Sequence, residues 1–242
     1  MIDRPPRKNP TPAPVQASVT DADAPSPAVP RMTLFICGPF GAGKSTVTEF
    51  VAAELTARGH EVCTILLDEI GHELLAHNQK LRDILVESFG DEILRPDGQI
   101  DRSALAAVSF ADEVSQMALN AITHPPILTR AVEELARHAT ADFCVFEAPL
   151  PFSVLESTPG YGSEYLREAR DSGQVIAVMA PLDVRLRRVC EKGFTADDAC
   201  ARMAVQPDED AYLACADLRL DNKGDLSALR QATSELVDTL CR

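Results

Sequence analysis

Short, nearly continuous apolar runs recur along the chain and alternate with stretches in which apolar residues return every three or four positions. The runs have the length of β-strands, and because they do not alternate with polar residues, they indicate strands buried on both faces of a parallel sheet. The periodic stretches indicate helices that cover the sheet. We expect an α/β fold with strands at residues 34–37, 61–68, 143–147 and 175–179 and a weaker fifth at 218–220.

Two longer segments between these strands predict additions to the sheet. Residues 69 to about 141 are too long for a simple crossover and contain helical patterns at 81–89 and 104–122, which favours a helical insertion beside the site. A second excursion, residues 185–206, joins charged helices through Gly193 and has the pattern of a lid. The helix expected at 47–58 ends at Gly59, a residue that commonly stops helices.

The first 31 residues differ from the rest of the chain. They contain 8 of the 17 prolines, no glycine and no apolar periodicity, which predicts a disordered or semi-extended tail. The tail has basic residues but no apolar stretch like that of a signal peptide, and its aspartates argue against a transit peptide. We expect the folded domain to span residues 32–242.

A glycine-rich motif follows the first predicted strand and precedes the first predicted helix, so it fits the G-x-x-x-x-G-K-[ST] pattern in its required context. Backbone N–H groups of such a loop turn towards phosphate oxygens, and the helix N-terminus adds its positive end. Lys44 can reach the β- and γ-phosphates of a nucleoside triphosphate, and Ser45 can ligate Mg²⁺. The motif therefore predicts a P-loop NTPase fold of three layers and a nucleotide site at Gly38, Gly41, Ala42, Gly43, Lys44, Ser45 and Thr46.

Charge and composition narrow the partners. The formal net charge of −14 argues against nucleic acid, which requires a basic face, and no stretch approaches the length of a membrane span. The seven cysteines lack CxxC spacing, and several lie in strand runs, so we expect reduced core residues. These features indicate a cytoplasmic protein; they do not indicate an oligomeric state.

Two carboxylates follow predicted strands at the edge where parallel sheets bind ligands. In phosphoryl transfer, Asp68 could accept the proton of the acceptor hydroxyl, and Glu147 could hold Mg²⁺ through water. The alternative is that both acids merely begin turns after strands.

Basic residues suited to a triphosphate must be concentrated locally in so acidic a chain. Arg188 and Arg202, with Arg185 and Arg187, could close over triphosphate charge. The ordinary alternative is a solvated helix face that pairs with nearby acids. His124 stands before two prolines, where a helix does not comfortably continue, and on its own would more often be structural.

Several motifs, in order from about residue 32 to the end, resemble the dephospho-CoA kinase family. After the P-loop come Asp68 with the helix-starting Ile70-Gly71-His72-Glu73-Leu74, then Phe89-Gly90 and Asp97-Gly98 with Asp101-Arg102, then His124-Pro125-Pro126-Ile127, Glu147-Ala148-Pro149-Leu150-Pro151-Phe152, Arg202-Met203-Ala204-Val205-Gln206, Ala216-Asp217 and Asn222-Lys223-Gly224.

This resemblance implies a kinase that transfers the γ-phosphate of ATP, with Mg²⁺, to the ribose 3′-hydroxyl of dephospho-CoA, the last step of coenzyme A synthesis. It implies that residues 69–127 form the helical domain on the CoA side and about 187–206 the lid. It also implies that Asp68 is catalytic together with Lys44 and that Arg102 and His124 lie near the acceptor.

Four positions depart from the family's pattern, namely Leu66, His72, Glu191 and Tyr212, and they bear on lid contacts and acceptor affinity. Two rival hypotheses remain: another small P-loop kinase of nucleosides or nucleoside monophosphates, and a nucleotide-binding regulator that has lost turnover. The motif around His124 and the Asp97-Gly98 segment speak against the first. Retention of Lys44, Ser45, Asp68 and Glu147 speaks against the second.

Overall fold

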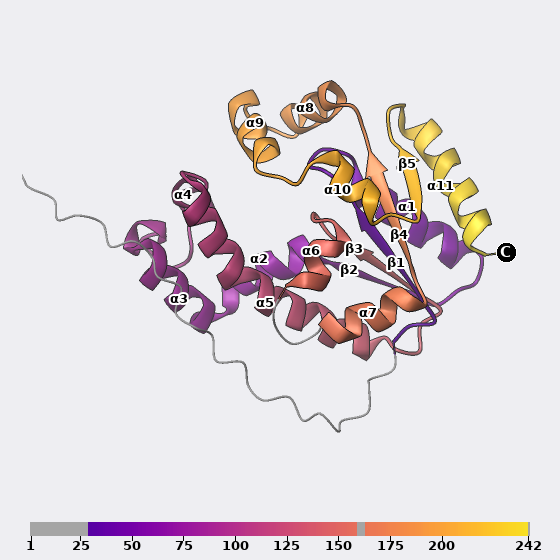
Figure 1. The fold of residues 1–242 in the computed structure, drawn as a ribbon, viewed down its shortest axis with the longest axis horizontal. Helices are drawn as coiled ribbons and strands as arrows, with labels where there is room; N and C mark the ends of the chain where they lie inside the picture. Colours follow the sequence, from indigo (N-terminus) through magenta and orange to yellow (C-terminus); the bar gives the residue numbers. More distant parts are fainter. Residues whose placement is uncertain (1–28, 159–162, 242) are drawn as a thin grey trace, which may run out of the picture. The chain divides into compact units, whose positions relative to one another are not determined.

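A computed structural model of the chain describes residues 29–158 and 163–241 (Figure 1). The predicted N-terminal tail therefore lies outside the described residues except for its last three. The described residues fall into two compact units, one of residues 69–127 and one made by the segments on either side of it. We call them the helical unit and the sheet unit.

The sheet unit is built on a five-stranded, all-parallel sheet with the order β2-β3-β1-β4-β5 (Figure 1). This confirms the predicted fold class, and each strand lies within two residues of its expected position. The apolar runs form strands because β-branched and aromatic side chains pack well on a pleated surface that is covered on both sides. The strands are β1 Met32–Cys37, β2 Val62–Leu66, β3 Phe143–Glu147, β4 Gln174–Met179 and β5 Leu218–Asp221.

One face of the sheet carries helices α1 (Lys44–Ala57) and α11 (Leu226–Leu240), which lie side by side (Figure 1). Val47, Val51 and Leu55 of α1 are fully buried and share one hydrophobic cluster with inward-facing strand residues and with Leu229 and Val237 of α11. The other face carries an aromatic group in which the Phe35 ring lies 5.2 Å from that of Phe146 and 4.8 Å from that of Phe152. Burial on both faces fixes β1, and with it the loop that follows β1.

Further helices complete the sheet unit. Helix α6 covers Phe152–Ser157 and α7 covers Ser163–Asp171. Between β4 and β5 the chain forms α8 (Leu182–Glu191), α9 (Ala196–Ala204) and α10 (Glu209–Ala214). Gly193, at φ 97°, lies between α8 and α9, and the Thr195 side chain caps α9 by accepting the N–H of Asp198.

The helical unit has its own core, which contains Leu81, Leu85, Ile93, Ile100 and Leu105. Its chain starts in α2 (Leu67–His77), forms α3 (Gln79–Phe89), a short 3₁₀ turn (Asp91–Ile93) and α4 (Arg102–Ser109), and ends within α5 (Glu113–Arg137). Asn78 and Asp101 cap α3 and α4 through side-chain oxygens that accept backbone N–H groups. These caps explain why both helices begin where they do.

Some boundaries differ from the sequence prediction. Residues 61–68 are not one strand: β2 ends at Leu66 and α2 begins at Leu67, which places Asp68 in a first helical turn. The helix expected at 104–122 is two helices, because Asp112 accepts the N–H of Ser115 and starts α5 anew.

Helix α5 also continues through Pro125 and Pro126, where we expected a helix to end. Inside a helix each proline removes one donor from the ladder and its ring crowds the carbonyl of the residue four positions earlier, so the rest of the helix must offset this cost. The 25-residue helix has ample neighbouring turns, and its C-terminal half buries Leu128, Val132 and Leu135.

In the part of the chain that the structure describes, no helix combines the length and the apolar character that a membrane span requires. The seven cysteines are all free, and those in strands, Cys37, Cys63 and Cys144, are buried as predicted.

Candidate active site

The strand register brings the chemically informative residues to one edge of the sheet. Glu147, the last residue of β3, is level with Ile36 of β1 and with Leu66 of β2. The glycine-rich loop leaves β1 directly after this level, and Asp68 lies two residues beyond Leu66. Loop and carboxylates therefore share the carboxyl edge of a parallel sheet, the usual place of a ligand site in such folds.

The glycine-rich loop needs glycine for steric reasons, as Gly38 and Gly43 show. Gly38 has φ 149°, and a Cβ there would lie 2.2 Å from the carbonyl oxygen of Val178. Gly43 has φ 93°, and a Cβ there would lie 2.3 Å from Nδ2 of Asn222. Both positions combine a backbone conformation that side chains disfavour with a close neighbour.

A polar brace holds this loop from β5 and α8. Asn222 is 4 % exposed, and its Nδ2 donates to the Ala42 carbonyl at 2.8 Å. Arg188 donates to the carbonyl of Asn222 at 3.0 Å, to its Oδ1 at 3.1 Å and to the carbonyl of Gly224 at 3.2 Å. These hydrogen bonds tie the loop backbone at Ala42 to β5 and α8. Asn222 entered the sequence analysis only through a family motif, and no local pattern marks its role.

Arg188 thus lies at the loop, as expected for a residue that binds the triphosphate. Its Nη1 and Nη2 groups, however, donate hydrogen bonds to the carbonyl oxygens of Asn222 and Gly224 and to the Asn222 side chain. Burial and the charge of Arg187 lower the pKa of its guanidinium.

Lys44, the first residue of α1, is the buried cation of the site. Its side chain is largely enclosed, and Nζ donates to the Pro39 carbonyl at 3.4 Å. Burial lowers the pKa of Lys44, and the charges of Asp68 and then Glu147 act in the opposite direction. A lysine held in this way sits in a low-dielectric environment where its charge acts strongly on a nearby anion.

Ser45 and Glu147 form the second polar pair. The Ser45 hydroxyl donates to Oε1 of Glu147 at 2.9 Å, while Oε2 of Glu147 is buried and has no hydrogen-bond partner among the described residues. Burial raises the pKa of Glu147, and the bond from Ser45, the charge of Lys44 and the nearby Thr48 hydroxyl oppose that effect. The Thr48 hydroxyl is itself buried and lies outside good hydrogen-bond geometry to Oε2. An ordered water or a hydrated cation would satisfy this buried carboxylate oxygen.

Oxygen ligands of this kind fit Mg²⁺, which keeps several waters and takes few protein ligands. Among the described residues no three His, Cys, Asp or Glu side chains gather as a metal cage. The Ser45–Glu147 pair is therefore suited to a hydrated ion that shares its other ligands with phosphates.

Arg202 of α9 lies on two aromatic rings. Its guanidinium carbon is 5.9 Å from the ring centre of Phe40, a residue of the glycine-rich loop, and 4.8 Å from that of Phe194. The two rings meet edge to face at 5.3 Å, and the Phe40 N–H donates to Oε1 of Gln206 at 2.7 Å. Arg202 is thus next to the loop, and the sequence analysis missed the part played by Phe40, Phe194 and Gln206.

Arg185 does not reach out as the predicted arginine cluster would need. Its side chain is buried, with Nε donating to the Ala180 carbonyl at 3.1 Å and Nη2 paired with Glu209 at 2.7 Å. Arg185 therefore anchors α8 to its surroundings. Its side chain is not available to close over the triphosphate, which corrects the expectation for this arginine.

The expected acceptor-side residues lie in the helical unit. Arg102, at the start of α4, contacts the ring Nε2 of His72 on α2. His124 lies inside α5, where burial lowers the pKa of its imidazole. No contact between Arg102 and His124 is recorded within the helical unit.

The positions that depart from the family pattern have local explanations. Tyr212 is fully buried, and its hydroxyl donates to the Pro149 carbonyl at 2.9 Å. Leu66 ends β2, His72 contacts Arg102, and Glu191 ends α8 on the surface. Tyr212 thus fills core space.

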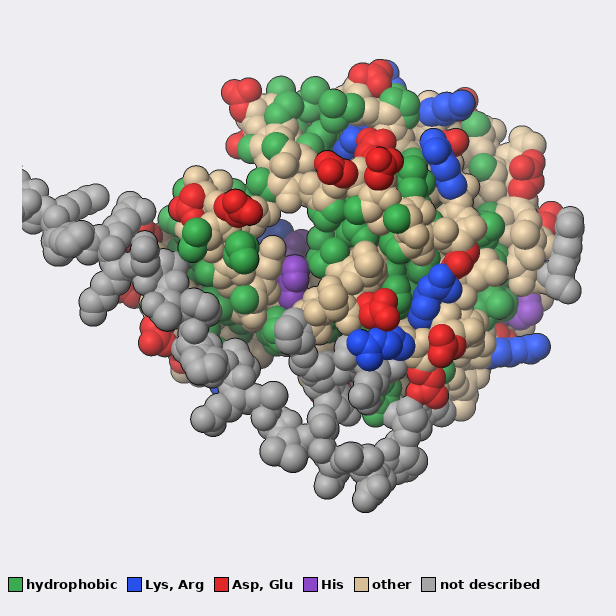
Figure 2. Space-filling view, in the orientation of Figure 1, with side chains coloured by type: hydrophobic (Ala, Val, Ile, Leu, Met, Phe, Trp, Pro, Cys, Tyr) green, Lys and Arg blue, Asp and Glu red, His purple; other side chains and the backbone are tan. Residues whose placement is uncertain are grey.

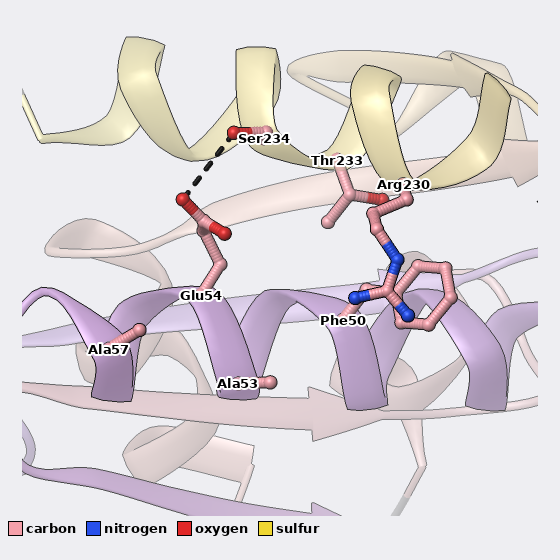
Figure 3. A pocket seen from close by; sticks show the side chains of 7 residues that line it. All are labelled: Phe50, Ala53, Glu54, Ala57, Arg230, Thr233 and Ser234. Carbon is pink, nitrogen blue, oxygen red and sulfur yellow. Dashed lines mark hydrogen bonds between the residues drawn. The ribbon is translucent and has the colours of Figure 1, made fainter. Parts of the chain in front are cut away.

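A separate cavity of about 240 Å³ lies between α1 and α11 (Figure 3). Arg230 lies over the ring of Phe50 at 4.3 Å, and Ser234 donates to Glu54 at 3.4 Å (Figure 3). Glu54 also accepts from Arg58 at 2.9 Å. The residues that line this cavity include neither the glycine-rich loop nor Asp68 or Glu147, so it is not the candidate active site.

On the face that Figure 2 draws, acidic and basic side chains are interspersed, and the described residues show no continuous basic surface there.

Comparison with known proteins gives a consistent result. Residues 32–228 match the family model of dephospho-CoA kinase. A dephospho-CoA kinase of Corynebacterium glutamicum is 32 % identical over 207 residues, which cover 84 % of this chain and 94 % of that protein. A crystal structure of the protein TT1252 from Thermus thermophilus is similar with a TM-score of 0.61 at 29 % identity, covering 88 % of this chain and 98 % of that one.

The structure of a dephospho-CoA kinase from Campylobacter jejuni, with a TM-score of 0.54, 24 % identity and coverage of 86 % and 96 %, shares the fold. The matched region includes the glycine-rich loop, both carboxylates, the helical unit and α8 to α10. On this evidence the chain belongs to the dephospho-CoA kinase family.

Proposed function

We propose that this chain phosphorylates the ribose 3′-hydroxyl of dephospho-CoA with ATP, which gives coenzyme A and ADP. Membership of the family supports this directly. The observation on which the chemistry rests is the buried Lys44 at the head of α1, with the charges of Asp68 and Glu147 acting on it. We also propose that residues 69–127 bind the CoA side of the acceptor and that 187–206 act as a lid.

The glycine-rich loop would hold the triphosphate. Its backbone N–H groups and the N-terminus of α1 favour an anion, and the brace from Asn222 and Arg188 keeps the loop shaped beforehand. Lys44 would contact the β- and γ-phosphates, and Arg202 would neutralise further charge from the outer side. Preformed donors of this kind favour a transition state in which charge spreads over the phosphoryl oxygens.

The hydroxyl of Ser45 and the carboxylate of Glu147, the latter through water, would hold Mg²⁺. When bound, the ion would neutralise charge on the β- and γ-phosphates. The partnerless Oε2 of Glu147 supports this assignment, since an ordered water or ion would satisfy it.

Asp68 would accept the proton of the acceptor hydroxyl. As the 3′-oxygen forms its bond to the γ-phosphorus, the bond from that phosphorus to the bridging oxygen breaks, and ADP leaves. The proton passes to the Asp68 carboxylate. The position of Asp68 in the first turn of α2, exposed at the carboxyl edge of the sheet, supports this role.

Arg102 and His124 would bind the acceptor, by the family resemblance. Arg102 is exposed and offers donors suited to a phosphate, since a guanidinium binds phosphate in a planar fork. The cytoplasmic location stays a prediction, as does the absence of a nucleic-acid partner.

Purified protein incubated with ATP and Mg²⁺ tests the proposal through ADP release with dephospho-CoA, AMP, CMP and uridine as separate acceptors. Release selective for dephospho-CoA is expected. Release only with AMP, CMP or uridine would make the chain a nucleoside or nucleotide kinase. ATP binding without release for any acceptor would make it a regulator.

A further inference from the structure

The lid segment and the phosphate loop meet at a cluster of four side chains, Phe40, Phe194, Arg202 and Gln206. We call it the ring seat. Phe40 is in the loop itself, Phe194 lies between α8 and α9, Arg202 is in α9, and Gln206 follows α9. All four belong to the sheet unit.

Phe40 has no evident task in a phosphate loop. Such loops bind phosphate through backbone N–H groups, for which a large apolar side chain adds nothing. Its ring meets the Phe194 ring edge to face at 5.3 Å, with an interplanar angle of 82°. An aromatic pair in this arrangement holds its members in a preferred orientation.

The guanidinium of Arg202 lies over both rings, closer to Phe194 than to Phe40. Arg202 is otherwise an exposed side chain, and no ion pair with an acid is recorded for it among the described residues. A long side chain of this kind loses much rotamer entropy when it binds a ligand. A cation over aromatic faces has lost part of that freedom before the ligand arrives.

The fourth contact fixes the end of α9. Oε1 of Gln206 accepts the N–H of Phe40 at 2.7 Å, so a side chain beyond the lid helix binds the loop backbone next to the ring contact. Two independent contacts thus join the same loop residue to both ends of the α9 segment. The position of α9, and of the arginine that it carries, is therefore tied to the loop.

We propose that Phe40 and Phe194 are positioning residues for Arg202: the ring seat holds its guanidinium beside the phosphate loop so that it meets the triphosphate with little loss of freedom. This inference rests on the proposed function for its catalytic meaning, but its effect on ATP binding does not depend on the acceptor. Gln206, which accepts the Phe40 N–H, holds the end of α9 at the loop and so keeps the rings and Arg202 together.

A double-mutant cycle on ATP affinity, measured by calorimetry with Mg²⁺ and no acceptor, tests the proposal. Phe194→Leu keeps an apolar side chain of similar size but removes the ring, and Arg202→Met keeps the unbranched stem but removes the charge. Phe194→Leu is expected to weaken ATP binding about fivefold, the factor that a partly exposed cation–π contact is worth. In the Arg202→Met protein, the same substitution is expected to cost nothing further.

Phe194→Tyr supplies the matched control, because it restores the ring and is expected to bind ATP within twofold of the wild type. An equal loss from Phe194→Leu with and without Arg202 would overturn the proposal, because the ring would then act on packing alone. Unchanged affinity in Phe194→Leu would overturn it as well.

A fluorescence measurement makes the test independent of folding defects. The chain contains no tryptophan, so Phe194→Trp introduces a single reporter into the seat. Its emission is expected to change when ATP binds and not to change with ATP in Phe194→Trp combined with Arg202→Met. A change of the same size in both proteins would contradict the link to Arg202.

These readouts separate this inference from the proposed function. If the wild type releases no ADP with dephospho-CoA, the proposed function is refuted. The double-mutant cycle still tests the ring seat, because it measures ATP affinity without an acceptor. Normal turnover with an additive cycle refutes the ring seat alone.

Discussion

The Ser45 hydroxyl donates to Oε1 of Glu147 at 2.9 Å and leaves the other carboxylate oxygen buried without a partner in the described part of the chain. The two residues come from the start of α1 and the end of β3, and are 102 positions apart in sequence. The strand register places Glu147 level with Ile36, just before β1 ends at Cys37, and the loop that follows brings Ser45 to it. The sheet thus places both members of the pair at its carboxyl edge.

Glu147→Gln should raise the Mg²⁺ concentration needed for half-maximal turnover about tenfold, because an amide oxygen carries no charge to hold the hydrated ion. Activity measured over a Mg²⁺ titration at fixed ATP checks this. Glu61→Gln, an exposed residue one position before β2, is the control. An unchanged Mg²⁺ dependence would remove Glu147 from the ion site.

The same substitution predicts a pH dependence of stability. Burial raises the pKa of Glu147, so its contribution to stability is complete below the pKa of the unfolded chain and is lost as pH rises through the raised pKa of the folded protein. Glu147→Gln should therefore gain stability over the wild type as pH rises above about 4.3, the pKa of an unfolded glutamate, and through the raised pKa of the folded protein. Denaturant melts without nucleotide check this, and a constant difference across that range would contradict it.

Lys44→Met should lower kcat/KM for ATP about 100-fold or more, because it removes the charge that meets the phosphates. Its stability should not fall, because the wild-type protein bears the cost of burying an ammonium group, which lowers the pKa of Lys44. Steady-state kinetics and thermal melts check the two parts. Normal activity would refute the loop assignment, and a large loss of stability would refute the account of its burial.

Asp68→Asn should lower kcat about 100-fold while ATP affinity changes little, because a general base contributes in the transition state. Calorimetry for ATP and initial rates with dephospho-CoA check both quantities. Glu69→Gln, the next residue along α2 and also exposed, is a matched control. Similar kcat in Asp68→Asn and the wild type would remove Asp68 from the mechanism.

Gly43→Ala should weaken ATP binding at least about tenfold, because its Cβ would collide with Nδ2 of Asn222 in a strained backbone conformation. Gly59→Ala is a close control: Gly59 has φ 88°, against 93° for Gly43, but open space around its Cβ position. It shares the backbone strain and lacks the collision. Equal ATP affinities in the two variants would contradict the role given to the brace.

Much of this architecture was readable from the sequence. Apolar runs without alternation predicted five parallel strands, and the motif at the end of β1 predicted the phosphate loop. These signals are local, because a strand buried on both faces must be apolar throughout and a tight turn around phosphate must contain glycine.

Other features were not readable. Periodicity could not show that α5 passes through Pro125 and Pro126, since the neighbouring turns sustain the helix there. Nor could it show that Arg185 is engaged by Glu209 while Arg202 lies on Phe40 and Phe194. Those outcomes depend on which elements the folded chain places side by side, and single residues do not encode that.

The most direct test of the central claim is to follow the γ-phosphate of labelled ATP and determine its position in the product by mass spectrometry and phosphorus NMR. The account predicts a phosphate monoester on the ribose 3′-oxygen of dephospho-CoA, formed with one equivalent of ADP and formed about 100-fold more slowly in Asp68→Asn. Label found only in inorganic phosphate, or on another hydroxyl or phosphate, would contradict it.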